Sequence, residues 1–570
     1  MIKIAVCAAL AFLSYFAFFS VHASFMPPVQ HFGGAVFVVA VFWLYYRHGA
    51  LPVKSDRKAE YIFAVLLSLA HLLGITFTRY NSFALFFASP VSAMYFALLL
   101  FGFVPFFYVV TCLLADKVLD LKIGKDDEGR FSGFLAPFVL FLVAWLPYFF
   151  IYFPGNLIND SIRQLAQFEG ITPYINHHPI ISTLFMGVFY RVGIMLGSAN
   201  LGLALITVVH NLMMAAAFSL ALLYLKKWGV AYKVRLVVML FFAAFPVFGI
   251  WAQTILKDTH AAAVMLVFVL FYIDLTRRFS RRRLVFCLVA AVVASLFRNE
   301  VVFVVVPSIM ALVFVHKCPK RRAILVGCAV GVFVAVRIIV GGAMWITDAE
   351  RGSVREALSV PFQQTARFMR YHEDRITDAE RAVLAATFEN YYLIGELYDP
   401  RISDPVKNRF IEGADLGAYF RAWAAMGLRA PRAYLEAAIA VSFSYVVPFG
   451  PDWMIVWWES SHDVVPILER DDIGYVFTSR ETRLLPVRGI ELLQRLPIIG
   501  AFFHTGNYTW AMAFLVLLLI KRQQWTEILY FLPALMIILA CMASPVHGFW
   551  RYYLPILFMF PVLVALVIKE

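Results

Sequence analysis

Ten polar side chains have types and positions that could do chemistry in a chain dominated by apolar residues. Five of them lie in a polar stretch between Phe153 and Thr183, which has apolar segments on both sides. Polar groups at the mouth of a membrane bundle cost free energy, so they indicate a functional site by default. The ten residues are Asp160, Gln164, Asn176, His177, His178, Lys257, Asp258, Arg298, Glu300 and Arg551.

Asp160 follows the apolar segment 131–153 and the helix-stopping pair Pro154-Gly155, so it can begin a short helix. The i, i+4 and i+7 spacing then places Asp160, Gln164 and Gln167 on one helix face. Two interpretations stay open. Asp160 is a helix cap only, or it is a catalytic carboxylate whose pKa is tuned by apolar surroundings.

The string Asn176-His177-His178-Pro179 ends the polar stretch and starts the next apolar helix. Adjacent histidines point in different directions on a helix, which argues against one metal ion held by both through regular geometry. Hydrogen bonding to a substrate phosphate or sugar, structural capping and metal binding all stay open for this pair.

The other five residues are charged and interrupt apolar helices. Lys257 and Asp258 either pair with each other or bind a phosphate together. In the second case Lys257 holds the phosphate, and Asp258 orients it or shares a metal with it. Arg298 either pairs with Glu300 or binds a lipid-linked phosphate with its planar fork. Arg551 lies among aromatic residues, so it is either an interfacial anchor or a second cation for the phosphate.

The composition indicates an all-α polytopic membrane protein. The chain has 570 residues, of which 62% are hydrophobic, and its apolar runs are long enough to cross a bilayer as helices. The six cysteines show no metal-ligand spacing. We expect about 14 spans, at 1–25, 31–47, 60–78, 92–115, 131–153, 200–225, 234–252, 260–276, 284–298, 300–316, 322–343, 508–520, 526–543 and 551–568.

The net charge of +13 does not indicate nucleic-acid binding, because the basic residues gather in short connections, as the positive-inside rule requires. These connections, expected to be cytoplasmic, are 47–58, 117–130, 226–235, 277–283, 317–322 and 521–522. The alternate connections then face outward and contain all ten residues. They are 153–199, 253–260, 298–300, 344–507 and 544–551.

The expected organisation has three parts. Residues 1–343 form an N-terminal transmembrane module that includes the outward loop 153–199. Residues 344–507 form a small outward-facing mixed domain, in which 437–449 is interfacial or re-entrant. Residues 508–570 form a C-terminal segment of three transmembrane helices. Whether the first helix is cleaved stays open.

Seven strings carry a resemblance to a known class. They are FPGNLINDSIRQ, INHHPIISTLF, ILKDTHAAAVML, LFRNEVV, LSVPFQQTARF, YDPRISDPVKNRF and FWRYYLPIL. In this order they resemble an uncharacterised family of bacterial multi-spanning proteins related to the GT-C class of integral-membrane glycosyltransferases. The resemblance covers about residues 90–570. It implies GT-C-like architecture in the bacterial cytoplasmic (inner) membrane, with an active site on the outer face.

The resemblance also implies an activity, namely inverting transfer of a sugar from a polyprenyl-phosphate-linked donor to a glycan, lipid or protein acceptor. GT-C enzymes place a catalytic Asp in the first large outward loop, so Asp160 is implied as the general base. Lys257, Arg298 and Arg551 would stabilise the leaving phosphate. A divalent cation (Mg or Mn) stays open, because members of the class differ in metal use. The class often has two adjacent acids in this loop, whereas Ser161 follows Asp160 here.

Three other functions stay open. A transporter or flippase of lipid-linked sugars would have sites near the midplane and internal symmetry, whereas this sequence has no evident repeat and its polar residues gather on one side. A polymerase or ligase of lipid-linked glycans would share the outward arginines. The third of these alternatives is a non-catalytic scaffold. The sugar, the acceptor and the oligomeric state cannot be inferred from the sequence.

Overall fold

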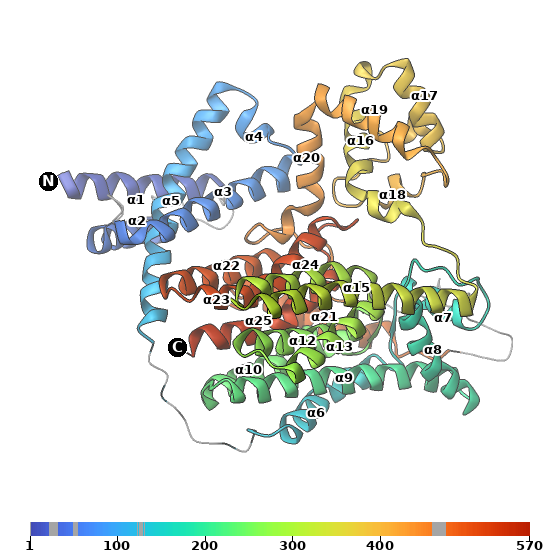
Figure 1. Cartoon of the computed structure of the whole chain (residues 1–570). Helices are drawn as coiled ribbons and strands as arrows, with labels where there is room; N and C mark the ends of the chain where they lie inside the picture. The colour runs from blue at the N-terminus through green and yellow to red at the C-terminus, as the bar shows by residue number, and fades with distance from the viewer. Residues whose placement is uncertain are drawn as a thin grey trace.

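Apolar helices make up most of the protein, whose structure is a computed structural model (Figure 1). The structure describes residues 2–21, 32–49, 55–121, 124, 129, 131–458 and 475–569. The remaining residues lie outside this description, including the end of the segment 1–25 and parts of the basic connections 47–58 and 117–130. The described residues define an all-α membrane protein, with one small two-stranded sheet among them.

Eight helices in the described part of the chain are long and apolar enough to cross a membrane. They are α1 (Ile2–Val21), η1–α3 (Ser55–Tyr80), α5 (Pro90–Leu119), α9 (Ala199–Lys227), α12 (Lys257–Arg277), α15 (Pro319–Thr347), α23–α24 (Trp525–Met542) and α25 (Trp550–Ile568). A ninth results if α10 (Tyr232–Ala244) and α11 (Pro246–Ala252), which bend by 55° at their junction, form one span.

The remaining predicted segments are also helical, but each helix is shorter than a full span. They are α2 (Phe32–His48), α6 (Leu135–Ile151), α13 (Arg281–Phe297), η2–α14–η3 (Asn299–Phe314) and α22 (Thr505–Lys521). Each of the fourteen predicted segments therefore falls on a helix.

The expected loop 153–199 is largely helical. It contains β1 (Asn156–Leu157), α7 (Asn159–Phe168) and α8 (Ile180–Met195), and α8 packs on α9. The backbones of these two helices touch, because a Cβ atom on Gly193 would lie 2.0 Å from the backbone nitrogen of Gly202. Small residues allow such close approach between helices in a membrane. The apolar α8 has only 16 residues, which is too short to be recognised as a span.

The helices α12 and α25 form the centre of the bundle, and α9 packs on both (Figure 1). Their interface contains aromatic pairs such as Phe218 of α9 and Phe558 of α25, whose ring centroids lie 4.9 Å apart. The helices α1, α2, α3 and α5 have separate hydrophobic clusters and adjoin the rest through contacts such as Phe63 with Trp510. Residues 1–343 thus contain two packed groups of helices.

Charged residues mark the two ends of the bundle differently. Asp274, near the last residue of α12, pairs with Lys227 at 2.8 Å and Arg283 at 2.7 Å. Lys257 is the first residue of the same helix. Two of the predicted basic connections, 226–235 and 277–283, therefore adjoin the end of α12 that is opposite to Lys257.

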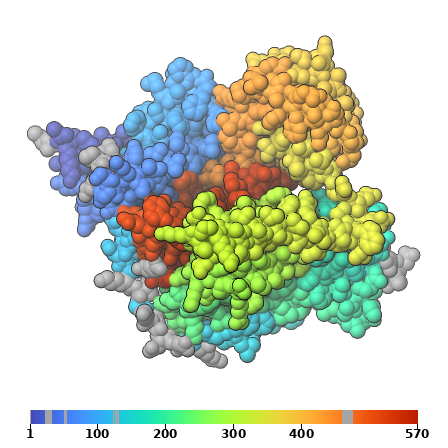
Figure 2. All heavy atoms as spheres, in the orientation of Figure 1, coloured from blue at the N-terminus to red at the C-terminus, as the bar shows by residue number. Residues whose placement is uncertain are grey.

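The region 344–507 is divided between two bodies. One is a helical unit with its own core around Phe362 and Tyr419, which stands above the bundle in yellow and orange (Figure 2). Its helices are α16 (Ser359–His372), α17 (Asp378–Thr387), α18 (Asp404–Lys407), α19 (Leu416–Arg429) and α20 (Pro431–Ser442), with η4 (Val354–Leu358), η5 (Glu373–Arg375) and η6 (Tyr391–Leu393). It is called the α16–α20 unit below.

The rest of that region packs on the bundle. After α20, η7 (Phe443–Tyr445) leads to Val447, whose side chain lies against Gly74 of α3. The segment 437–449 is thus a short helix end packed against neighbouring helices. Farther on, α21 (Arg480–Gln494) and η9 (Gly500–Phe503) also pack on bundle helices. The short α4 (Ala84–Phe87) precedes α5.

Candidate functional site

Two short parallel strands place two aspartates in equivalent positions. In this pairing β1 lies beside β2 (Thr254–Ile255), with Asn156 opposite Thr254 and Leu157 opposite Ile255. Each strand continues into a helix, so Asp160 in α7 and Asp258 in α12 both lie four residues after an opposed pair. The local strings, NLINDS and TILKDT, are alike. The parallel register therefore brings the start of both helices to one place.

The connection before Asp160 is held by Arg483 of α21, a buried arginine. Its guanidinium donates to Asn156 Oδ1 at 2.8 Å and to the backbone oxygens of Tyr152 and Gly155 at 3.1 and 3.2 Å. Buried polar groups of the backbone need such partners. Arg483 thereby fixes the strand that carries Asp160, and sequence reasoning had not identified it.

Asp160 lies between two cations. Its Oδ2 atom accepts hydrogen bonds from Lys257 Nζ at 2.7 Å and from Arg551 Nη2 at 2.5 Å. Burial raises the pKa of the Asp160 carboxyl, but the charges of Arg551 and Lys257 outweigh it and hold the pKa well below its usual range. The side chain is still 21% exposed. Asp160 is therefore an ionised carboxylate that solvent can reach.

Arg551 connects this pair to a second group of charges. Its Nε atom lies 3.6 Å from Asp258 Oδ2, and Arg298 Nη1 lies 3.1 Å from Asp258 Oδ1. Arg298 Nε also donates to Glu300 at 2.5 Å. Both guanidinium groups lie over the ring of Tyr552, at 5.3 and 5.1 Å. Three cations and three carboxylates thus form one continuous cluster.

The two adjacent histidines have different partners, as their spacing predicts. Lys257 Nζ donates to His178 Nδ1 at 3.3 Å. Burial, followed by the charge of Lys257, lowers the pKa of His178 well below its usual value. His177 is more exposed, and its Nδ1 atom lies 3.7 Å from Glu356 Oε1. Only His178 therefore touches the charged cluster.

Gln164 and Asn176 lie beside the cluster, in contact with other groups. Gln164 Nε2 donates to Thr183 Oγ1 of α8 at 2.9 Å. The backbone nitrogen of Asn176 donates to the oxygen of Glu350 at 2.9 Å, and Asn299 Nδ2 donates to the oxygen of Asn176 at 3.4 Å. All ten residues predicted from the sequence are consequently in or next to one site at one end of the bundle.

The α16–α20 unit is attached to both sides of this site. On one side Glu356, which faces His177, accepts a hydrogen bond from Lys407 at 2.7 Å. On the other side the backbone of Ser403 donates to Pro545 at 2.8 Å, six residues before Arg551. Sequence reasoning missed these contacts, although the strings at 358–368 and 398–410 mark the segments involved.

A buried hydrogen-bonded chain lies under the site and also escaped sequence reasoning. His210 Nδ1 is 3.2 Å from the backbone oxygen of Thr254, His210 Nε2 is 3.1 Å from His260 Nδ1, and His260 Nε2 is 2.9 Å from Ser182 Oγ. With neutral rings, each histidine donates through Nδ1 and accepts at Nε2. The chain ties β2, α9, α12 and α8 together. Single histidines within apolar helices were its only sequence signal.

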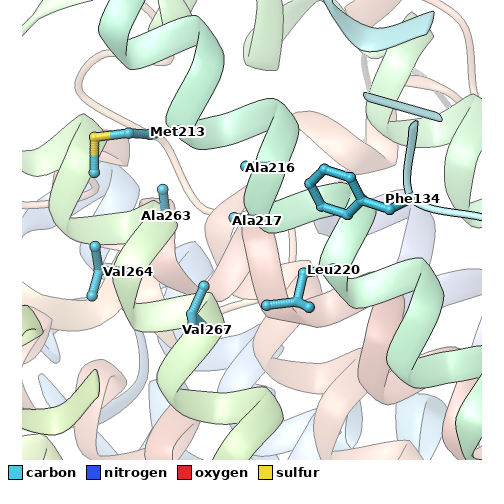
Figure 3. Close-up of a pocket in the computed structure, with 8 residues that line it drawn as sticks. All are labelled: Phe134, Met213, Ala216, Ala217, Leu220, Ala263, Val264 and Val267. Atoms are coloured by element: carbon cyan, nitrogen blue, oxygen red, sulfur yellow. The ribbon is translucent and has the colours of Figure 1, made fainter. Parts of the chain in front are cut away.

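The described residues contain no group of three or more His, Cys, Asp or Glu side chains arranged to hold a metal ion. An apolar hollow of about 270 Å³ lies between α9 and α12, where Met213, Leu220 and Val267 are among its lining residues (Figure 3). Its lining has no titratable side chain. This hollow therefore offers no group for acid–base chemistry.

The fold and the site define an all-α membrane protein with a charged, partly exposed site at one end of its helix bundle. The chain belongs to DUF6020, a family of unknown function that matches residues 169–570. Asp160 and Gln164 precede the matched region, and the other eight predicted site residues lie within it. No curated protein and no solved structure matches the chain.

Proposed function

We propose that the protein is a membrane glycosyltransferase of the GT-C type, which transfers a sugar from a polyprenyl-phosphate-linked donor to a glycan, lipid or protein acceptor. The observation that carries the proposal is the position of Asp160 between Lys257 and Arg551. Arg298 is connected to Arg551 through Asp258, which pairs with both arginines. This arrangement combines a proton acceptor and several phosphate-binding cations within one partly exposed site.

The cations suit a lipid phosphate. Arg298 and Arg551 present planar forks that can bind phosphate oxygens in pairs, and Lys257 supplies a point charge. When a phosphate group pairs with Lys257 and Arg551, the hydrogen bonds from these two residues to Asp160 weaken. The pKa of Asp160 then rises toward that of an effective base, because nearby positive charge is what lowers it.

The reaction follows from these positions. Asp160 takes the proton of an acceptor hydroxyl, and the hydroxyl oxygen forms a bond to the anomeric carbon of the sugar. The bond between that carbon and the phosphate oxygen breaks, and its electron pair leaves with the polyprenyl phosphate. Lys257, Arg298 and Arg551 stabilise the charge of the leaving phosphate. Attack opposite the leaving group inverts the configuration.

The proposed enzyme has about 14 membrane-spanning helices and lies in the bacterial cytoplasmic membrane. Its active site faces outward, because the basic connections 226–235 and 277–283 adjoin the opposite end of α12 and positive charge favours the cytoplasm. A divalent cation would add positive charge at the phosphate, and the partly exposed Asp160 would be one of its ligands. A transporter would instead place its binding site near the middle of the membrane.

Replacement of Asp160 by asparagine tests the proposal. Cells that carry Asp160→Asn should lose one surface glycan and accumulate its lipid-linked sugar donor. Arg163→Gln is the matched control, because Arg163 is exposed on the same helix, and it should leave both profiles unchanged. Normal surface glycans with folded Asp160→Asn protein in the membrane would overturn the assignment. Chain-length analysis of the product separates single-sugar transfer from polymerase or ligase activity.

A further inference from the structure

Seven buried polar atoms in or beside the charged cluster have no hydrogen-bond partner among the residues that the structure describes, and three of them belong to the ion-paired Asp258 and Arg551. The other four belong to the segment from α7 to the start of α8. They are Gln164 Oε1, Gln167 Oε1, Asn176 Oδ1 and His178 Nε2. Buried polar atoms without partners destabilise a fold, and most folded proteins contain few of them. Their concentration in one segment therefore points to a ligand that supplies the missing hydrogen bonds.

Two of these atoms lie along the face of α7 that begins with Asp160. Gln164 and Gln167 follow Asp160 at i+4 and i+7, which keeps the three side chains on one side of the helix. This side faces α8, because Gln164 Nε2 donates to Thr183. Figure 1 shows α7 and α8 beside each other at one end of the bundle. The unpaired oxygens of Gln164 and Gln167 therefore lie on the side of α7 that faces α8, about one and two turns along the helix from Asp160.

The hydrogen-bonding role of His178 can be assigned from its neighbour. The ammonium group of Lys257 can only donate, so His178 Nδ1 accepts its hydrogen bond. A neutral imidazole then carries its proton on Nε2. His178 Nε2 is consequently a buried donor in the same segment as the acceptor oxygens of Gln164, Gln167 and Asn176.

One donor among several acceptors is the pattern that hydroxyl groups satisfy, because each hydroxyl can both donate and accept. The four groups are neutral, whereas the cations that suit a phosphate come from α12, α25 and the residue that follows α13. The two parts of a phosphosugar would thus meet different surfaces. Hydroxyls would lie against the α7–α8 segment and the phosphate against the cations.

We propose that Gln164, Gln167, Asn176 and His178 form a subsite for the hydroxyl groups of a neutral hexose, adjacent to the phosphate-binding cations. The inference rests on the proposed function and adds the substrate class. A uronic acid fits poorly, because its carboxylate would lie beside the amide oxygens of Gln164 and Gln167. Polar sites built to pair with a substrate hydroxyl also reject analogues that leave them unpaired.

Binding of lipid phosphates to the full-length protein in nanodiscs tests the subsite. The probes are polyprenyl phosphate and its glucosyl, mannosyl, galactosyl and glucuronosyl esters. At least one neutral hexosyl lipid should bind more tightly than the bare phosphate, and the glucuronosyl lipid should not. Gln167→Met should reduce this preference about fivefold to tenfold, the value of one lost hydrogen bond. The Kd of bare polyprenyl phosphate should stay the same.

Thermal stability provides a second readout. Methionine replaces an unpaired buried oxygen with an apolar group, so Gln167→Met should have the same Tm as the natural protein or a higher one. The matched variant Gln364→Met changes a partly buried glutamine of α16 whose Nε2 donates to Tyr434 and whose Oε1 accepts from Trp423. It should lower the Tm and leave the preference among lipids unchanged.

The outcomes separate the two proposals. If bare polyprenyl phosphate binds but no neutral hexosyl lipid is preferred, the subsite is wrong and the proposed function stands. The same conclusion follows if Gln164→Met and Gln167→Met both leave the preference intact. If none of the lipid phosphates binds the natural protein, the proposed function itself is overturned.

Discussion

Asp160 and Asp258 occupy equivalent positions after two parallel strands, and the guanidinium of Arg551 contacts both carboxylates. The contacts are 2.5 Å from Nη2 to Asp160 and 3.6 Å from Nε to Asp258. Asp160 is partly exposed, whereas Asp258 is 1% exposed. The two carboxylates therefore differ in role. Asp258 fixes the arginines, and Asp160 faces the side from which a ligand can enter.

Replacement of Arg551 by lysine should lower transfer activity by at least about tenfold, because a lysine cannot contact both aspartates through a planar fork. The measurement is kcat/KM with a lipid-linked sugar donor in proteoliposomes. Arg337→Lys is the control, since Arg337 also lies over an aromatic ring, that of Phe333, but on the exposed side of α15. Full activity of Arg551→Lys would contradict the bridging role.

The structure also predicts how stability depends on pH. Burial and Lys257 keep the pKa of His178 well below its usual value, so His178 stays neutral in the folded protein. The unfolded chain has an ordinary histidine, with a pKa of about 6.5. Below this pH the unfolded state binds more protons, so stability is full above pH 6.5 and falls as the pH decreases.

This dependence can be measured through the Tm of the purified protein between pH 8 and pH 5. His178 contributes a slope of at most about 1.4 kcal/mol per pH unit below pH 6.5. His178→Gln cannot titrate, so its Tm should fall less steeply than that of the natural protein. Equal slopes for the two proteins would show that His178 is charged in the folded state.

Several features of the site could be predicted because they depend on charge and hydropathy alone. The alternation of basic connections assigned Lys257, Arg298 and Arg551 to the same side of the bundle as Asp160. In the structure, contacts connect all four residues. Charged residues within apolar sequence have few stable positions, so their location is strongly constrained.

Other features had no sequence signal of this kind. The strands β1 and β2 have two residues each, which is too short for a periodic pattern. Their pairing joins residues almost 100 positions apart, and only the fold brings them together. The contact of Glu356 with Lys407 and His177 likewise depends on how the α16–α20 unit packs, which local sequence does not determine.

Close contact between α8 and α9 should be essential for stability. Gly193→Ala would place a Cβ atom 2.0 Å from the backbone of Gly202, so the helices must separate. We expect a loss of about 1–3 kcal/mol, typical of overpacking, and lower activity because α8 carries Thr183. Gly331→Ala in α15 is the control, since no atom of another described helix lies within 4 Å of that Cβ position. It should be neutral or slightly stabilising, and equal Tm values would contradict the packing argument.

The attachment of the α16–α20 unit can be tested with two neighbouring glutamines of α16. Gln363 Nε2 donates to the backbone oxygens of Asp399 and Ile402 at 2.8 and 2.7 Å, and this loop pairs with residues 545–547. Gln363→Leu removes both hydrogen bonds and leaves two partly buried carbonyl groups with fewer partners. Hydrogen exchange should therefore increase at 399–403 and at 545–547, the segment that leads to Arg551.

The neighbouring residue distinguishes this effect from a general loss of stability. Gln364 Nε2 donates to the oxygen of Tyr434, and its Oε1 accepts from Trp423 Nε1, both at 3.1 Å. Gln364→Leu should increase exchange in α19 and α20 and leave 545–547 unchanged. Because 545–547 lies directly before α25, only Gln363→Leu should also reduce transfer activity. Identical exchange patterns for the two variants would show that the loop 399–403 does not stabilise the segment 545–547 before Arg551.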